Sequence, residues 1–166
     1  YLKISEYRYW SDEAEQEKII KEIMNDEELS DFARMRIWSN TFPEVQLKYT
    51  DILIELLEKN EYILEVWEGT DDRVKENVFE KDIESIKDDD VILKICEITN
   101  TDILVKNSEK IPFIVEAYVN KGKFLGIHIK KAINQIAEDK EKIIDIMMKA
   151  NFKARQEIFW ALDNKH

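Results

Sequence analysis

The residue types that most often carry catalysis or bind metals are scarce in this chain, which has one cysteine and two histidines. Cys96 ends the mostly apolar stretch 92–96, so we expect a buried, inert thiol and not a nucleophile paired with His128. His128 lies between two isoleucines of an expected helix, and His166 is the last residue. One cysteine and two separated histidines do not assemble a tetrahedral zinc site. We therefore expect no metal centre.

Carboxylates are abundant, but their spacing favours helix capping over metal binding. Asp88, Asp89 and Asp90 are consecutive, without the alternation and central glycine of a calcium loop. Asp71 and Asp72 have the same arrangement, and both groups precede expected helices, whose first N–H groups carboxylates stabilise. The three glycines form no phosphate-binding or dinucleotide-binding motif. We therefore expect no catalytic site and no cofactor, and predict that the chain is not an enzyme.

The charge balance is acidic, with 25 Lys and Arg against 36 Asp and Glu and a net charge of -11. This disfavours nucleic acid as a partner, because proteins that bind it neutralise phosphates with clustered basic residues. Residues 121–166 carry 10 basic and 6 acidic residues, a local charge of +4, so residues 1–120 carry -15. We expect an acidic face that meets a basic protein partner. The candidate partner-binding residues are Glu61, Glu65, Glu68, Asp71, Asp72, Asp88, Asp89 and Asp90.

Helical periodicity runs through almost the whole chain, and the Asn-Gly and Asp-Gly hairpin signals are absent. Asn25 with Glu28, and Thr41 with Glu44, have capping-box spacing, which predicts helices from 25 to about 40 and from 41 to about 59. The sequence thus predicts an all-α fold. Shorter helices are expected over 62–68, 71–86, 91–98, 102–109, 113–120, 124–136, 140–150 and 151–163.

Aromatic residues follow the same helical spacing. Core positions are predicted for Trp38, Trp67, Phe159 and Trp160. A second group crowds the first ten residues, where packing onto the first helices is expected and an exposed anchor for a partner is the alternative. That group is Tyr1, Tyr7, Tyr9 and Trp10.

The chain also contains a candidate repeat, because residues 63–79 align without gaps on residues 143–159. Segments that begin at 92 and 114 fit the first half of the same pattern. The matched apolar residues are Ile63, Leu64, Val66, Trp67, Val74, Val78 and Phe79 on Ile143, Ile144, Ile146, Met147, Ala154, Ile158 and Phe159. A short helix pair with one apolar stripe buries that stripe only by stacking on neighbouring pairs.

Over about residues 60–163 this pattern resembles the HEAT-like α-solenoids, and most closely their leucine-rich repeat variant. The resemblance implies short antiparallel helix pairs stacked as a small solenoid. The Asn-Pro turn usual in that family is missing after Phe79 and Phe159, and an irregular helical bundle is the alternative. We expect a single helical domain over 1–166, with N-terminal helices in 1–60 and repeat-like pairs in 60–163.

No apolar run approaches the roughly 20 residues of a membrane span, and the first residues lack the apolar region of a signal peptide. A single cysteine forms no intramolecular disulfide, which favours a reducing compartment. We therefore expect a cytoplasmic protein that does not contact membranes.

The first functional hypothesis is a non-catalytic interaction module, an α-solenoid scaffold or adaptor that uses its acidic surface. The alternative is an acidic inhibitor of a basic partner: an immunity protein, an antitoxin or a phage-encoded blocker of a nuclease-type target. An enzyme would need a pocket with titratable residues around Cys96 and His128. A basic groove that reads DNA is the most distant hypothesis.

Overall fold

The computed structural model describes residues 12–163, and these residues form twelve α-helices, short 3₁₀ and π turns and no strand. The predicted all-α class is therefore confirmed. Two compact units make up the chain, unit 1 ending at Val78 and unit 2 beginning at Phe79. This division falls within the range 60–163 for which repeat-like pairs are predicted. The N-terminal aromatic group and His166 lie outside the described residues.

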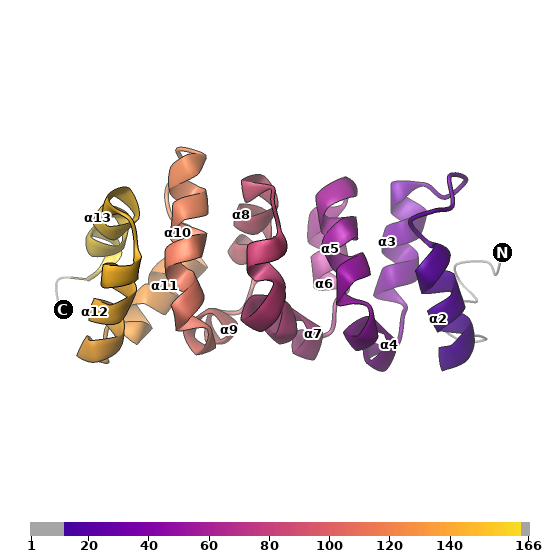
Figure 1. Cartoon of the computed structure of the whole chain (residues 1–166), viewed down its shortest axis with the longest axis horizontal. Helices are drawn as coiled ribbons and strands as arrows, with labels where there is room; N and C mark the ends of the chain where they lie inside the picture. The colour runs from indigo at the N-terminus through magenta and orange to yellow at the C-terminus, as the bar shows by residue number, and fades with distance from the viewer. Residues whose placement is uncertain (1–11, 164–166) are drawn as a thin grey trace. The chain divides into compact units, whose positions relative to one another are not determined.

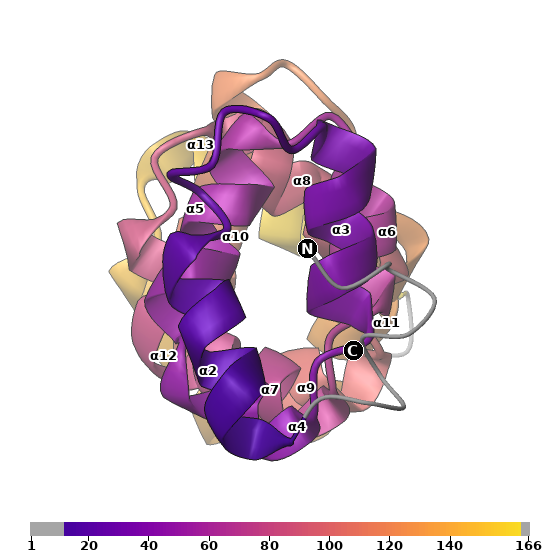
Figure 2. The same ribbon diagram turned by 90° about the vertical axis from the view of Figure 1, so that its right-hand side faces the viewer.

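Unit 1 is built from six helices that pack through apolar side chains. Helix α3 packs against α6, α6 also contacts α5, and α4 lies beside α2 and α7 (Figure 2). Trp38 and Trp67, both predicted as core, are fully buried in this unit. The helices are α2 (Glu13–Glu22), α3 (Asp31–Ser39), α4 (Pro43–Lys48), α5 (Thr50–Lys59), α6 (Ile63–Glu68) and α7 (Asp72–Asn77).

The predicted capping box at Asn25 and Glu28 is wrong, because α3 begins only at Asp31. Ser30 caps this helix, and its hydroxyl accepts a hydrogen bond from the Ala33 N–H at 3.1 Å. The preceding stretch is a turn, which Arg34 stabilises by donating to the carbonyls of residues 23 and 26 at 2.9 and 2.8 Å. A side-chain contact from within the helix thus takes precedence over the local capping pattern.

The predicted helix from 41 to about 59 is also interrupted. Thr41 donates its hydroxyl hydrogen to the Ile37 carbonyl at 2.7 Å, so it belongs to the end of α3. Pro43 lies in the first turn of α4, where its missing N–H costs little. At Tyr49 the backbone leaves the helical region with φ -122° and ψ 44°, and its hydroxyl donates to Glu17 of α2 at 3.1 Å.

Unit 2 contains six further α-helices, of which α8, α10 and α12 stand side by side (Figure 1). Helix α11 packs against α8 and α9, and α13 packs against α10 and α11. The elements from the junction onward are η1 (Val78–Asp82), η2 (Ile83–Ser85), α8 (Asp89–Ile98), α9 (Thr101–Lys106), η3 (Ser108–Lys110), α10 (Ile111–Asn120), α11 (Ile127–Ile136), α12 (Lys140–Lys149) and α13 (Phe152–Ala161).

Helix boundaries in unit 2 follow the predictions more closely than in unit 1. Gly122 follows α10 with φ 63°, a left-handed conformation that suits glycine at a helix end. Asn151 caps α13 by accepting from the Ala154 N–H at 2.9 Å. The predicted helix over 71–86 ends early, at Asn77, and continues as the π and 3₁₀ turns. The predicted start at 124 moves to Ile127, which leaves Phe124 in a loop.

Hydrogen bonds fix the last helix of unit 2 at both ends. Arg155 donates to the carbonyls of Met147 and Ala150, at 2.8 and 3.2 Å, and so holds the end of α12 against α13. Asn134 of α11 donates to the Ala161 carbonyl at 2.9 Å and accepts from the residue 163 N–H at 2.8 Å. These hydrogen bonds fix the position of α13 relative to α11 and α12. None of the helices described here has the length and apolarity needed to cross a membrane.

Candidate functional site

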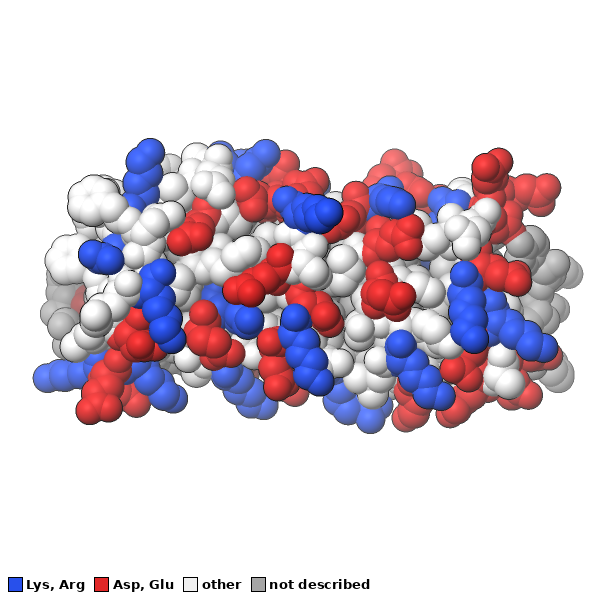
Figure 3. All heavy atoms as spheres, in the orientation of Figure 1, with Lys and Arg blue, Asp and Glu red and all other residues white. Residues whose placement is uncertain are grey.

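Most of the exposed large apolar side chains among the described residues belong to one C-terminal segment of the chain. Nine of them are exposed, and seven of these nine belong to residues 124–160 of unit 2. Figure 3 shows uncharged side chains over α13 at the C-terminal end of this unit, and charged side chains over the lower part of α12. We call these seven residues the C-terminal apolar surface: Phe124, Ile127, Ile144, Met148, Phe152, Phe159 and Trp160.

The surface arises because α12 and α13 carry apolar residues on two sides. On α13 the inward side buries Ala154 and Ile158, while Phe152 and Phe159, seven residues apart, share the outward side. Trp160 is 68% exposed next to them. The predicted core positions of Phe159 and Trp160 are therefore wrong. The apolar residues of α13 cover more than one face of the helix, and this width is the sequence signal that some of them are exposed.

Helix α12 has the same construction. Its inward side buries Ile143 and Ile146, whereas Ile144 and Met148, four residues apart, face outward. Met148 is 74% exposed. Methionine side chains are flexible and polarisable, so they adapt to partners of varied shape.

Two shallow hollows lie on this surface, and α13 lines both of them. The first, of about 220 Å³, has the apolar residues Phe124, Leu125, Trp160 and Ala161 with Lys130 and Glu157. The second, of about 390 Å³, is lined by Ile144, Met147, Met148 and Arg155. Hollows that combine apolar walls with a few charged groups are typical of sites that bind apolar side chains of a partner.

Three charged residues line these hollows, the basic Lys130 and Arg155 and the acidic Glu157, and further basic residues lie nearby in the sequence. Lys123, Lys130, Lys153 and Arg155 are exposed, and none forms an ion pair with a described residue. Lys149 is paired with Asp145 at 2.9 Å on α12. The surface therefore has a positive rim, in contrast to the acidic balance of the whole chain.

The eight predicted acidic residues are divided between the two units. Glu61, Glu65, Glu68, Asp71 and Asp72 belong to unit 1, and the Asp88–Asp90 run belongs to unit 2. Asp71 caps α7 by accepting from the Arg73 N–H at 3.0 Å and pairs with the guanidinium at 3.1 Å, which raises the pKa of Arg73. The carboxylate of Asp72 lies 3.7 Å from Lys75. Asp71 thus stabilises the start of its helix, as its position predicts.

The run in unit 2 has the same structural role. Asp88, the first of the three aspartates, caps α8 by accepting from the Asp90 N–H at 2.9 Å. Asp89 accepts from the Asn120 amide at 3.3 Å. Asp90 pairs with Lys121 at 3.1 Å, and hydrogen bonding to this carboxylate raises the pKa of Lys121.

Glu65 and Glu68, three residues apart, lie on the same side of α6, and Glu61 precedes this helix by two residues; we call the three residues the α6 acidic stripe. All three are exposed, and Glu65 and Glu68 form no ion pair with a described residue. The negative charge of Glu61 raises the pKa of the neighbouring Tyr62 hydroxyl. The ring of Tyr62 packs edge-on against the ring of Phe32, with 5.7 Å between the ring centroids.

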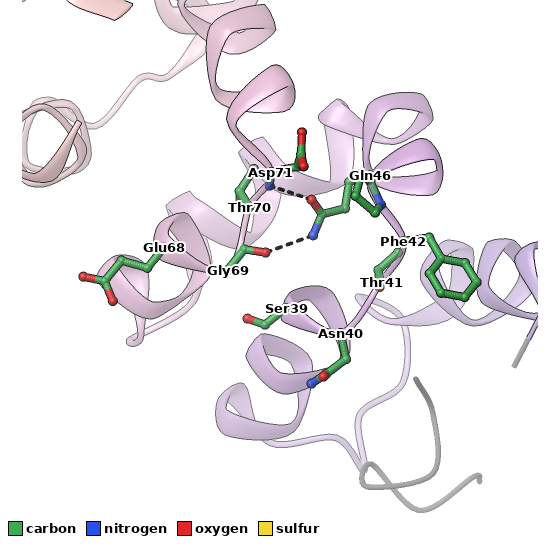
Figure 4. A pocket seen from close by; sticks show the side chains of 10 residues that line it. Ser39, Asn40, Thr41, Phe42, Gln46, Glu68, Gly69, Thr70 and Asp71 are labelled. Carbon is green, nitrogen blue, oxygen red and sulfur yellow. Dashed lines mark hydrogen bonds between the residues drawn. The ribbon is translucent and has the colours of Figure 1, made fainter. Parts of the chain in front are cut away.

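A polar pocket of about 310 Å³ lies in unit 1, between the turn that ends α3 and the turn between α6 and α7 (Figure 4). Gln46 lies at its centre and is 2% exposed. Its amide nitrogen donates to the carbonyls of Trp38 and Gly69, at 2.9 and 3.0 Å. Its oxygen accepts from the Asp71 N–H at 2.9 Å. The Gln46 amide therefore joins the two turns through its hydrogen bonds. Glu68 points away from the other lining residues (Figure 4).

Cys96 and His128 are both in unit 2. The Cys96 side chain is fully buried, as expected, and this burial raises the pKa of its thiol. His128 lies with its Nδ1 3.3 Å from the Thr101 hydroxyl oxygen. Within residues 12–163, no three His, Cys, Asp or Glu side chains are grouped in a way that suits a metal ion.

No family model, curated protein or solved structure matches this chain. The HEAT-like resemblance therefore stays a prediction that depends on the repeat pattern.

Proposed function

We propose that this chain is a non-catalytic protein interaction module that docks its partner on the C-terminal apolar surface. The observation that carries the proposal is that seven of the nine exposed large apolar side chains cluster in residues 124–160. Monomeric proteins rarely expose large contiguous apolar patches, and such patches mark interaction sites. Four of the seven are aromatic, three of them on α13, and aromatic residues, tryptophan above all, contribute strongly to binding interfaces.

The proposed architecture is a stack of short antiparallel helix pairs, similar to the HEAT-like solenoids. Burial at matched repeat positions supports it. Phe79 is fully buried, whereas its repeat equivalent Phe159 is 64% exposed. Likewise Trp67 is fully buried and its equivalent Met147 is partly exposed. Inner pairs of a stack are covered by the next pair, and the outer side of a terminal pair is not.

The test is affinity capture from the native host lysate with the purified chain and two variants, with captured proteins quantified by mass spectrometry. Phe159→Ser with Trp160→Ser should lower recovery of the specific partner by about ten-fold or more, because exposed aromatic anchors dominate binding energy. Leu64→Ser, which changes an apolar residue of unit 1 that is 40% exposed, is the matched control and should keep the partner. Equal recovery by all three proteins, or capture of no partner, would refute the proposal.

A second candidate is an acidic inhibitor of a basic, nuclease-type protein, favoured by the α6 acidic stripe. Two of its three carboxylates are free of ion pairs with described residues. Such an inhibitor would bind one partner tightly, with fast and salt-sensitive association. Glu65→Lys with Glu68→Lys should then abolish capture while the Phe159 and Trp160 variant retains it. The opposite result favours docking on the C-terminal apolar surface.

A further inference from the structure

We infer that the segment which occupies the C-terminal apolar surface is an acidic amphipathic α-helix of a partner protein. The inference rests on the proposed function, since it specifies the chemistry of the partner at the same surface. It combines three properties of unit 2: a surface built mainly from helices and without a strand, two hollows beside one helix, and exposed basic residues around them.

The backbone argument concerns how a partner gains hydrogen bonds. An extended peptide binds well where it adds a strand to an open sheet edge. The described residues contain no strand, and the surface is formed by α11, α12, α13 and the short loop that carries Phe124. These helices satisfy most of their backbone groups internally, so an extended peptide would leave its own groups to water. A helix brings its backbone hydrogen bonds with it and presents only side chains.

The shape argument concerns the two hollows. One holds Trp160 and the other Arg155, both of which belong to α13. Phe152 and Phe159 project outward from the same helix. Apolar residues of a docking helix recur every three to four residues, so one stripe can fill a hollow and pack against this aromatic ridge. The stacking proposed for the inner pairs would then be repeated by the partner.

The charge argument fixes the flanks of that helix. Lys130 lines the first hollow and Arg155 the second, and Lys123 and Lys153 are exposed nearby in the sequence. The opposing carboxylate in these hollows is Glu157. Acidic flanks would therefore face cations that have no ion pair with described residues. A second copy docked face to face would bring two basic rims together, which like-charge repulsion disfavours.

The test uses two synthetic helical peptides of about 18 residues, or five turns. They share one leucine stripe with spacings of three and four residues and differ only in their flanking residues, glutamate in one and lysine in the other. Binding is measured by tryptophan fluorescence, because Trp160 is exposed while Trp38 and Trp67 are fully buried. Trp160→Phe identifies the share of the signal that comes from the surface.

We expect the glutamate peptide to bind about ten-fold more tightly than the lysine peptide at low salt. The difference should shrink at about 0.5 M salt, where exposed charges are screened. Lys130→Glu with Lys153→Glu should remove the preference. Lys18→Glu, an exposed position on α2 of unit 1, is the matched control and should leave it unchanged.

Equal or tighter binding of the lysine peptide would overturn the acidic character. Failure of both peptides would overturn the helical occupant, while capture that still depends on Phe159 and Trp160 would leave the proposed function intact. Sedimentation that shows self-association, lost in the Phe159→Ser variant, would instead identify a second copy as the occupant. These outcomes separate failure of the inference from failure of the proposed function.

Discussion

Replacing Gln46 with methionine tests whether one buried amide stabilises unit 1. Methionine keeps the length of the side chain but removes its three hydrogen bonds. The Trp38 carbonyl keeps a second donor, the Thr41 N–H at 3.1 Å, so its loss is small. The Gly69 carbonyl and the Asp71 N–H both lose the Gln46 partner. An unsatisfied buried group costs about 1–3 kcal/mol, and both groups are only partly buried, so we expect a loss of about 2–4 kcal/mol.

That loss is large against a total stability of about 5–15 kcal/mol. Urea unfolding followed by tryptophan fluorescence measures it, because the buried Trp38 and Trp67 both report on unit 1. The matched control is Gln135→Met on α11, an exposed position where a change within about 0.5 kcal/mol is expected. If Gln46→Met unfolds at the same urea concentration as this control, the amide bridge does not stabilise unit 1 and the argument fails.

Three further perturbations test other parts of the structure. Gly69→Ala would place a Cβ atom 2.6 Å from Cβ and 3.0 Å from Cα of Ser39, and urea unfolding should show a loss of about 1–3 kcal/mol. Burial raises the pKa of the Cys96 thiol above its ordinary 9.0, so above pH 9 the unfolded chain loses a proton that the folded chain keeps. The free energy of unfolding should therefore fall with rising pH, by at most about 1.4 kcal/mol per pH unit. In Cys96→Ala, urea unfolding at pH 9 and at pH 10 should show a smaller fall in this free energy than in the unchanged chain. Phe159→Ser with Trp160→Ser should change stability by only about 0.5 kcal/mol yet reduce binding of an apolar fluorescent dye, and a large destabilisation would show that these side chains belong to the core.

Apolar periodicity predicted the helix boundaries well wherever a capping residue or a glycine lies next to the end of the helix. Helix α10 is one example, since Gly122 adopts a positive φ just after it and few other residues do so without strain. The junction at Asn151 is another, because its side chain caps α13 within the same turn. In both places the contacts that end or begin the helix lie within a few residues. Local sequence therefore contains the information needed.

Boundaries that depend on distant contacts were not predictable in this way. Asn25 and Glu28 satisfy the spacing of a capping box, yet Arg34 holds that stretch in a turn from the following helix. The break at Tyr49 coincides with a hydrogen bond to Glu17, 32 residues earlier. Capping patterns estimate only local free energy, of about 1 kcal/mol for each cap, and a few tertiary contacts outweigh that.

The candidate site was missed for a related reason. Phe79 and Phe159 occupy equivalent positions of the proposed repeat, and the spacing of the repeat assigns both to the same apolar stripe. One is fully buried and the other is 64% exposed, because exposure depends on which neighbours cover the helix. The sequence thus predicted the apolar spacing of α13 correctly, while the side on which α13 meets water required the arrangement of unit 2.

The net charge of a chain does not locate its binding surface, whereas exposed apolar area does. The charge of -11 sums over carboxylates that cap helices, as Asp71 and Asp88 do, and over carboxylates in ion pairs, as Asp90 is. Such groups are already engaged within their own unit, so their number does not locate a binding surface. Burial of apolar surface supplies about 25 cal/mol per Å², and this term selects the place where a partner docks. In the proposed complex, Lys130 beside Trp160 and the exposed Lys153 and Arg155 of α13 would favour an acidic partner, whereas the total charge of the chain favours a basic one.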